Sequence, residues 1–330
     1  MNYGETDSWV SLTAFVRNGD QVGQTRSVMV RGLSTKQINE VSKWLGVDDN
    51  LAPFTVRAGV EGLEMHVLGT VVDNITGDSV LYLPSFHDEP RIWLVGVAHL
   101  EGVNESQWRT DLWLYNPTET WLGGELEYVV GDSPSDVYGF EWPILNNNRI
   151  KQYIDIVGEE LGLLESRGYI VLTGVDVAPQ VAARTYNLDP SGGTYGLNLQ
   201  AFGSDDLLEP GETGYIAGIS NSEDQNIGFR TNMGFLNTDR YGWTGLRVTM
   251  YNLDGTLAAE PYEFDIAPGK LLQFDIFKKL GLRKITMTGS VKIEVLNGGS
   301  VASYATEVDN RTQDSIFIPA LTKYQGQVLN

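Results

Sequence analysis

The chain has 330 residues, a formal net charge of −20 and no cysteine, and 42% of its residues are hydrophobic. This length and apolar content predict two or three packed domains, while the lack of cysteine excludes disulfides, thiolate metal sites and cysteine nucleophiles. The negative charge opposes binding to nucleic acids and to anionic membranes, and no apolar run approaches the roughly 20 residues that span a bilayer, so no membrane insertion is expected.

One phrase occurs twice in the chain. Residues 71–84 read VVDNITGDSVLYLP, and residues 308–319 read VDNRTQDSIFIP. A catalytic loop normally occurs once, whereas a structural hairpin can occur once in every repeat. Polar turn residues between two β-rich runs predict a hairpin in both places.

A second pattern indicates the repeat length. The segments KQINEVSKWLGV (36–47), KQYIDIVGEELGL (151–163) and LQFDIFKKLGL (272–282) share a Gln, an apolar-acidic stretch and a Leu-Gly pair. Each predicts one or two helical turns that end at the Gly. These repeat markers recur at intervals of 115 to 121 residues and are Gln37, Gln152, Gln273, Gly46, Gly162 and Gly281.

A third pattern, aromatic-Arg-Thr followed by an apolar run and Asn, occurs twice, around Arg109 and Arg230. The two arginines are 121 residues apart, in agreement with the repeat. A recurring arginine in a β unit is expected to bind a carboxylate or a backbone carbonyl. Because the first copy would fall before residue 1, we expect the first unit to lack its first two strands.

The last third of the chain predicts eight short strands separated by turn signals. They lie near 213–219, 228–237, 244–251, 260–266, 270–276, 289–296, 300–308 and 314–319. A unit of this length and strand number predicts a two-sheet antiparallel β-sandwich. We therefore expect an all-β chain of three tandem sandwich units of about 115–120 residues. Their predicted limits are 1–86, 91–202 and 213–320, with acidic linkers at 85–90 and 203–212 and a tail at 321–330.

The three patterns together resemble tandem immunoglobulin-like β-sandwich units of bacterial secreted and cell-surface proteins. The resemblance extends over nearly the whole chain, although YNLDPSGGTYGLNL (186–199) replaces the doubled phrase in the second unit. It implies an immunoglobulin-like fold and an extracellular or cell-surface setting, and it implies no catalytic residues. The first residues, MNYGETDSWV, do not form a signal peptide.

Calcium is the metal that these acidic turns could bind, because it prefers carboxylate and carbonyl oxygens. The alternative, which the lack of EF-hand spacing favours, is that the side chains bind the backbone of their own turns. The candidate ligands are Asp73, Asn74 and Asp78, their counterparts Asp309, Asn310 and Asp314, and the linker residues Asp205, Asp206, Glu209 and Glu212.

Gly-Asp-Ser at residues 77–79 resembles the nucleophile block of GDS-type esterases. Such an enzyme needs a His base, usually with an Asp three residues earlier. The three histidines are His66, His87 and His99, and none has that partner. No catalytic residue is therefore assigned, and no enzymatic activity is expected.

These observations predict a non-enzymatic extracellular protein that acts as a spacer, adhesion or assembly subunit. Its expected partners are a protein or a cell-surface polysaccharide. Self-assembly by β-strand addition to the incomplete first unit is a further possibility. Two alternatives stay open: a carbohydrate-binding module array, suggested by eight tryptophans, and a hydrolase with its active site in an unrecognised loop.

Overall fold

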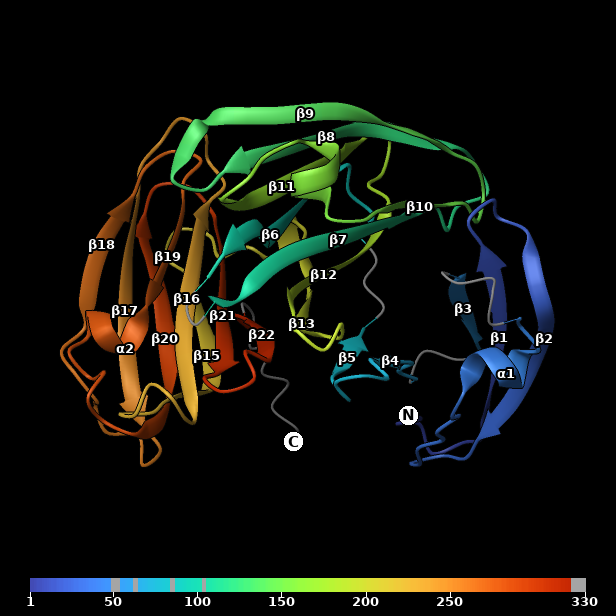
Figure 1. Cartoon of the computed structure of the whole chain (residues 1–330), viewed down its shortest axis with the longest axis horizontal. Helices are drawn as coiled ribbons and strands as arrows, with labels where there is room; N and C mark the ends of the chain where they lie inside the picture. Colours follow the sequence, from blue (N-terminus) through green and yellow to red (C-terminus); the bar gives the residue numbers. More distant parts are fainter. Residues whose placement is uncertain (49–53, 62–64, 84–86, 103–104, 322–330) are drawn as a thin grey trace.

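The computed structural model describes residues 1–48, 54–61, 65–83, 87–102 and 105–321, and it is all-β with antiparallel sheets, as predicted (Figure 1). Its helical segments are short: α1 (Val41–Leu45), η3 (Ile156–Glu160, a π-helical turn), η4 (Ser204–Asp206, a 3-10 turn) and α2 (Ile276–Lys279). Within these described ranges, no helix is long and apolar enough to cross a membrane.

The first part of the chain forms a three-stranded sheet and a separate hairpin. The sheet has the order β2-β1-β3, with β1 (Ser8–Val16), β2 (Gln21–Val30) and β3 (Phe54–Val60). Its apolar face packs on the α1 segment, where Leu45 is fully buried. The hairpin consists of β4 (Gly69–Val72) and β5 (Ser79–Tyr82), and it carries the first copy of the doubled phrase.

The middle of the chain forms two layers. The strands are β6 (Arg91–Glu101), β7 (Gln107–Tyr115), β8 (Leu122–Val130), β9 (Ser133–Leu145), β10 (Ile150–Tyr153), β11 (Ser166–Gly174), β12 (Gln180–Leu188), β13 (Thr194–Leu199) and β14 (Ala201–Phe202). Strands β6 and β7 pair at the hairpin that joins them, through Leu100–Trp108 and Glu101–Gln107. The chain then folds over into the layers β6-β11-β8-β9 and β10-β7-β12-β13. Leucines such as Leu94, Leu112 and Leu126 fill the core between them.

The last part of the chain also forms two sheets. They have the orders β15-β20-β17-β18 and β19-β16-β21-β22. The strands are β15 (Thr213–Asn221), β16 (Phe229–Asn237), β17 (Thr244–Asn252), β18 (Tyr262–Ile266), β19 (Leu271–Asp275), β20 (Met287–Asn297), β21 (Val301–Asp309) and β22 (Ser315–Pro319). Each lies within two residues of its predicted limits. The second copy of the doubled phrase is the β21–β22 hairpin, as predicted.

The strand order differs from that of immunoglobulin domains. In an immunoglobulin constant domain the first two strands lie in the same sheet. Here β15 and β16, the first two strands of the last part, lie in different sheets, and β6 and β7 pair only at the two residue pairs next to their hairpin. The expected immunoglobulin-like order is therefore corrected, because strand number and length do not specify which strands pair.

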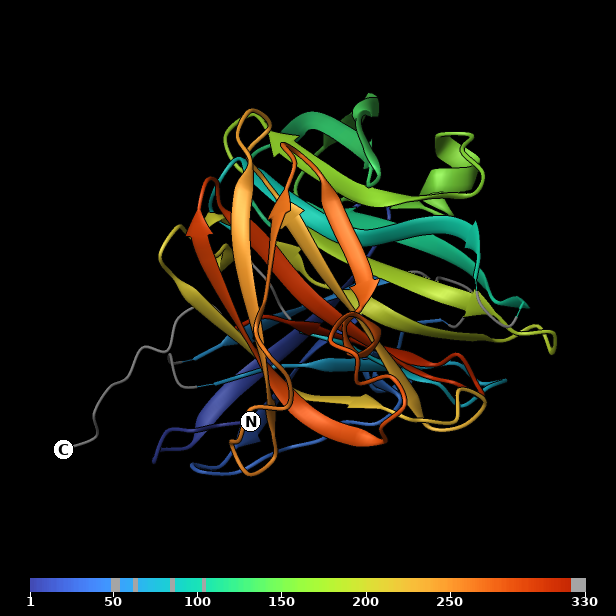
Figure 2. The same cartoon turned by 90° about the vertical axis from the view of Figure 1, so that its left-hand side faces the viewer.

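The middle and last sheets pack face to face through a shared apolar core. Val95, Tyr169 and Phe202 from one side meet Leu236 and Tyr304 from the other. Figure 2 shows the orange and red strands of the last two sheets in front of the green strands that they cover. The ring of Tyr304 stacks on Phe317 at 4.9 Å, and Phe317 in turn meets Phe202 edge-on at 6.3 Å.

The segment predicted as the linker 203–212 belongs to this packing. Leu207 and Leu208 are 4% and 0% exposed, and Leu208 exchanges two backbone hydrogen bonds of 2.9 Å with Val301. The acidic composition predicted an exposed linker, but these two leucines pack in the core and fix the segment against the last sheets. The predicted end of the first unit at residue 86 and residues 322–330 of the predicted tail lie outside the described residues, so the predicted unit limits stay predictions.

We expect Phe202→Ala to lower the stability of the middle and last parts together. The side chain is 1% exposed in the shared core, and removal of a buried Phe costs about 3–5 kcal/mol. Differential scanning calorimetry should show one cooperative transition at a lower temperature. Phe229→Ala, at a side chain that is 42% exposed, is the control and should change little. Two separate transitions of which one alone shifts would contradict the shared core.

Candidate functional site

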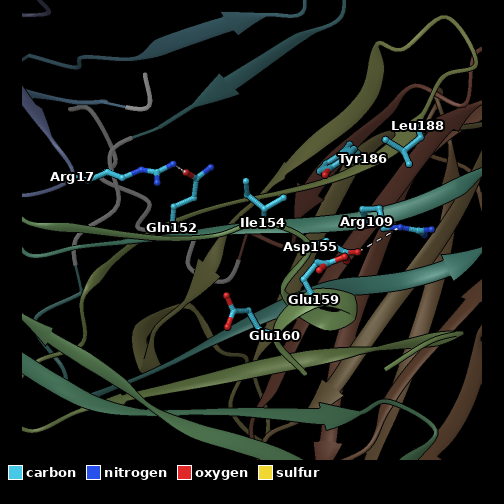
Figure 3. Close-up of a pocket in the computed structure, with 9 residues that line it drawn as sticks. All are labelled: Arg17, Arg109, Gln152, Ile154, Asp155, Glu159, Glu160, Tyr186 and Leu188. Carbon is cyan, nitrogen blue, oxygen red and sulfur yellow. Dashed lines mark hydrogen bonds and ion pairs between the residues drawn. The ribbon is translucent and has the colours of Figure 1, made fainter. Parts of the chain in front are cut away.

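A cleft of about 550 Å³ lies on the outer face of β7 and β12, beside η3 (Figure 3). We call it the Asp155 cleft, and its lining residues are Arg17, Arg109, Gln152, Ile154, Asp155, Glu159, Glu160, Tyr186 and Leu188. Two of them, Arg109 and Gln152, are repeat markers that the sequence had assigned a structural role. The cleft is therefore built partly from the repeat framework itself.

Strand alternation explains which side chains reach the cleft. Successive residues of a strand point to opposite faces, so Thr110 and Leu112 of β7 are fully buried while Arg109 and Asp111 lie on the outer face. On the neighbouring strand β12, Tyr186 pairs with Arg109 in the register. The outer face of these two strands is consequently a row of polar and ionisable groups.

Asp155 is the centre of the cleft's hydrogen-bond network. Its carboxylate lies 2.8 Å from Nδ1 of His99 and 3.6 Å from Nε of Arg109. It also accepts a hydrogen bond from the backbone N–H of Gly158 at 3.3 Å. Asp155 is 8% exposed and has a φ of 45°, a left-handed conformation that non-glycine residues adopt at a cost. The bonds to its side chain offset that cost.

Gly158 is required for the approach of His99 to Asp155. A Cβ on Gly158 would lie 2.3 Å from His99 Nδ1 and 2.5 Å from Asp155 Oδ2. A Cβ atom does not come this close to non-bonded atoms unless they shift. The Gly of the sequence VGEE thus has a packing role that no motif indicated.

A second carboxyl group, Asp111, lies behind Tyr186. It accepts hydrogen bonds from the Tyr186 hydroxyl at 3.1 Å and from the Asp155 backbone N–H at 2.9 Å. Burial raises the pKa of Asp111. Burial, followed by the charge of Asp111, raises the pKa of Tyr186, so its hydroxyl stays a donor. Because Asp111 does not line the cleft, it positions Tyr186 and does not reach a ligand there.

The far wall of the cleft comes from the first sheet. The guanidinium of Arg17, just after β1, donates to Oε1 of Gln152, and the backbone carbonyl of Arg17 accepts from Ile150 N at 3.1 Å. The rim is mixed: Glu159 and Glu160 are exposed, as are Ile154 (56%) and Leu188 (43%). The cleft offers charged acceptors, amide and guanidinium donors and two aliphatic surfaces.

The predicted calcium residues mostly make turn hydrogen bonds. Asp73 accepts from the backbone N–H groups of Ile75 and Thr76 at 2.8 and 3.1 Å. Asp309 makes the equivalent two bonds in the second copy of the phrase, both at 2.8 Å. The backbone bonds hold the pKa of Asp73 at about 2. In both turns the aspartate oxygens act as the predicted turn chemistry requires.

The two copies of the doubled phrase meet through their last aspartates. Strand β13 contacts both hairpins, β5 on one side and β22 on the other (Figure 1). Asp78 is paired with Arg184 at 2.9 Å and accepts from Gly196 N at 3.0 Å. Burial, followed by the charge of Asp78, raises the pKa of Asp314 to about 6. Asp78 and Asp314 are more than 230 residues apart in the chain, so no local sequence pattern indicated this contact.

The asparagines of the two phrases have different surroundings. Asn310 is 4% exposed and accepts from Arg230 Nη1 at 2.9 Å, while Asn74 is exposed. Among the linker residues, Asp206 lies 3.8 Å from His87, and Glu212 accepts from Glu209 N at 3.0 Å. The described residues contain no group of three or more carboxylates and histidines arranged to hold a metal. Calcium binding stays a prediction.

Several repeat markers have the predicted structural role. Gly46, Gly162 and Gly281 end the three helical segments with φ values of 70°, 66° and 74°, which confirms the predicted helix stops. Arg109 donates to the Trp108 carbonyl at 2.7 Å besides its contact with Asp155. Gln37 donates to Asn39 at the surface, and Gln273 pairs with Gly234 in the register of β16 and β19.

Sequence reasoning missed the partner of His99. The esterase pattern has an Asp three residues before its His, whereas Asp155 follows His99 by 56 residues. The signal that could have found it is the segment KQYIDIVGEELGL, because an Asp before a helical turn is a common N-terminal cap.

Comparisons with known proteins identify no family for this chain. No family model matches, and no curated protein matches. Among solved structures, one match is the crystal structure of allantoicase from Saccharomyces cerevisiae. It is 8% identical in sequence and covers 70% of this chain and 74% of that chain, with a TM-score of 0.16. A score this low carries no argument about fold or activity.

The predicted role as a non-enzymatic spacer, adhesion or assembly subunit is corrected. The physical basis of the prediction fails, because the middle and last sheets share a buried core and the predicted second linker is part of it. Units fixed in this way do not act as separately spaced modules.

We expect Gly158→Ala to displace His99 from Asp155. The added methyl group would overlap both side chains, and such overpacking typically costs about 1–3 kcal/mol. Chemical denaturation would measure the loss, and the NMR signals of the His99 ring would report its displacement. Gly69→Ala, at a position with no atom within 4 Å of the added carbon, is the control. Unchanged His99 signals in Gly158→Ala would contradict the close approach.

We expect stability to fall as the pH rises from about 4 to about 6, partly through Asp314. Its folded pKa of about 6 exceeds the ordinary value of 3.8, so the folded state holds a proton that the unfolded state releases in this window. Asp314→Asn should flatten the plot of melting temperature against pH. Asp254→Asn, at an exposed turn where hydrogen bonds to Thr256 lower the pKa, should not. Parallel curves for the wild type and Asp314→Asn would show that Asp314 does not titrate there.

Proposed function

We propose that the Asp155 cleft binds a neutral, hydroxyl-rich ligand of the carbohydrate class. The observation that carries this proposal is that both cations of the cleft already have acceptors within the protein. Arg109 lies against Asp155, and Arg17 donates to Gln152. A ligand carboxylate or phosphate would have to displace one of these partners, whereas a hydroxyl group can join them, because it both donates and accepts.

The charge around the cleft supports the same ligand class. Two arginines face three carboxylates, those of Asp155, Glu159 and Glu160, in the lining. The whole chain has a net charge of −20. Both the local and the overall field therefore disfavour an anionic ligand.

The size and surface of the cleft fit one or two sugar rings. Small-molecule sites usually enclose about 300–1,000 Å³ and combine apolar contact with a few placed polar groups. The cleft has about 550 Å³. Ile154 and Leu188 offer exposed aliphatic surface to the C–H face of a sugar, and the carboxylates of Glu159 and Glu160 can accept from its hydroxyls.

The proposed site lies at a junction, where Arg17 beside the first sheet meets Gln152 of the middle layers. The proposed partner is a polysaccharide in an extracellular or cell-surface setting.

We also infer that the chain contains three copies of one sandwich unit. The strand orders β6-β11-β8-β9 and β15-β20-β17-β18 correspond strand by strand, as do β10-β7-β12-β13 and β19-β16-β21-β22. The order β3-β1-β2 and the hairpin β4–β5 correspond to parts of each. The helical segment with its terminal glycine precedes β3, β11 and β20 alike. In this comparison, none of the strands described before β6 corresponds to the first two strands of the other units, β6 and β7 or β15 and β16.

Isothermal titration calorimetry with a panel of neutral and uronic-acid oligosaccharides tests the ligand class. We expect at least one neutral oligosaccharide to bind, and Gln152→Ala and Glu160→Gln to weaken its binding by roughly three- to tenfold, as the loss of one hydrogen bond does. Arg247→Ala, on β17 and far from the cleft in sequence and sheet, is the control.

Two results would overturn the proposal. One is the absence of binding to every neutral oligosaccharide up to about 10 mM, a weak limit for a specific site. The other is tighter binding of a uronic-acid oligosaccharide than of its neutral counterpart.

A further inference from the structure

The outer edge of β3 is unpaired within the described residues. The equivalent strands are flanked on both sides: β11 lies between β6 and β8, and β20 lies between β15 and β17. Strand β3 pairs with β1 on one side. An open edge presents backbone N–H and C=O groups that can pair with another strand.

The apolar face of β3 is also less covered than the apolar face of its counterpart β20. Phe54, Val56, Ala58 and Val60 face the core of the first sheet and are all partly exposed. On β20 the corresponding alternation, Val291, Ile293 and Val295, is at most 1% exposed. The apolar side chains of β20 are more buried because β15 and β16, the first two strands of the last part of the chain, help to cover them.

Strand β4 has a second open edge. Its counterpart β21 lies between β16 and β22, but β4 pairs with β5 alone among the residues that the structure describes. Val72 is 52% exposed, whereas Val308, at the same place in the doubled phrase, is 5% exposed. The apolar pattern of the phrase is kept, although no strand among the described residues covers it.

Asn74 indicates what a strand added at the edge of β4 would contribute. Its counterpart Asn310 accepts a hydrogen bond from Arg230 of β16 at 2.9 Å, and its backbone N–H donates to Gly228 at 2.8 Å. Asn74 is exposed. The surface around Asn74 is therefore matched to a strand that carries an arginine after an aromatic residue.

We propose that the edges of β3 and β4 form a docking surface for a β-hairpin of a partner polypeptide. The first strand of this hairpin would pair with β3 and cover its apolar face. The second would pair with β4 and place an arginine on Asn74. The partner is recognised by backbone pairing, by alternate apolar side chains and by this arginine, which is β-strand addition with side-chain selection. The proposal is independent of the ligand in the Asp155 cleft.

The occupant is specified by the chain's own geometry. The hairpin β15–β16 fills the equivalent position in the last part of the chain, with β15 on β20 and β16 on β21. A peptide with the sequence of residues 213–237 therefore has the required pattern and serves as the probe. The net charge of −20 further favours a natural partner that is neutral or basic.

Fluorescence anisotropy of the labelled 213–237 peptide with the full chain tests the proposal. We expect saturable binding, and at least fivefold weaker binding either for the protein variant Asn74→Ala or for the peptide variant Arg230→Ala. Combining the two changes should cause no further loss, because both remove one contact. Asn226→Ala, at an exposed turn residue, is the control and should bind like the wild type.

Hydrogen exchange locates the bound peptide. Protection of residues 54–60 and 69–72 on binding is expected. A peptide N-methylated at alternate residues should not bind, because it cannot pair with a strand edge. Absence of saturable binding would overturn the proposal, as would protection confined to residues 287–309, which would indicate exchange into the last sandwich. A dimer without peptide, with 54–60 and 69–72 protected, would show that the occupant is a second copy.

Discussion

The face-to-face packing of the sheets β6-β11-β8 and β19-β16-β21 is the constraint on which most of the molecule depends. Both sheets are apolar on both faces: each closes its own core and also contributes to the shared one. Such strands read as nearly continuous apolar runs, as in RIWLVGVAHL of β6 and VASYATEV of β21. Tyr304 is fully buried between the two sheets, at a position that would be open to water if the sheets were joined only by a linker.

The layers farther out are apolar on one face only, and this leaves room for polar chemistry. On β7 and β12 the inner face packs in the core while the outer face carries Arg109, Asp111 and Tyr186. These groups are close together in a half-buried setting, so they bind one another and hold fixed positions. The Asp155 cleft follows from this arrangement together with Arg17, which the first sheet delivers from outside the middle layers.

The doubled phrase shows how one local sequence acquires two environments. Asp73 and Asp309 make the same turn bonds, because those bonds involve neighbours one to three residues away. The later positions differ. Asp78 is neutralised by Arg184, whereas Asp314 lies against Asp78 and has a raised pKa. Asn310 binds Arg230, whereas Asn74 is open to solvent.

The sequence by itself determined the features that depend on short-range chemistry. These are the β class, the strands of the last third, the two hairpins and the glycine helix stops, since period-two alternation and positive φ act within a few residues. Only the tertiary structure decided which strands pair, that Leu207 and Leu208 are core rather than linker, and that His99 meets Asp155. These contacts join residues far apart in the chain. Their energies depend on which faces are buried together, and no local pattern encodes that.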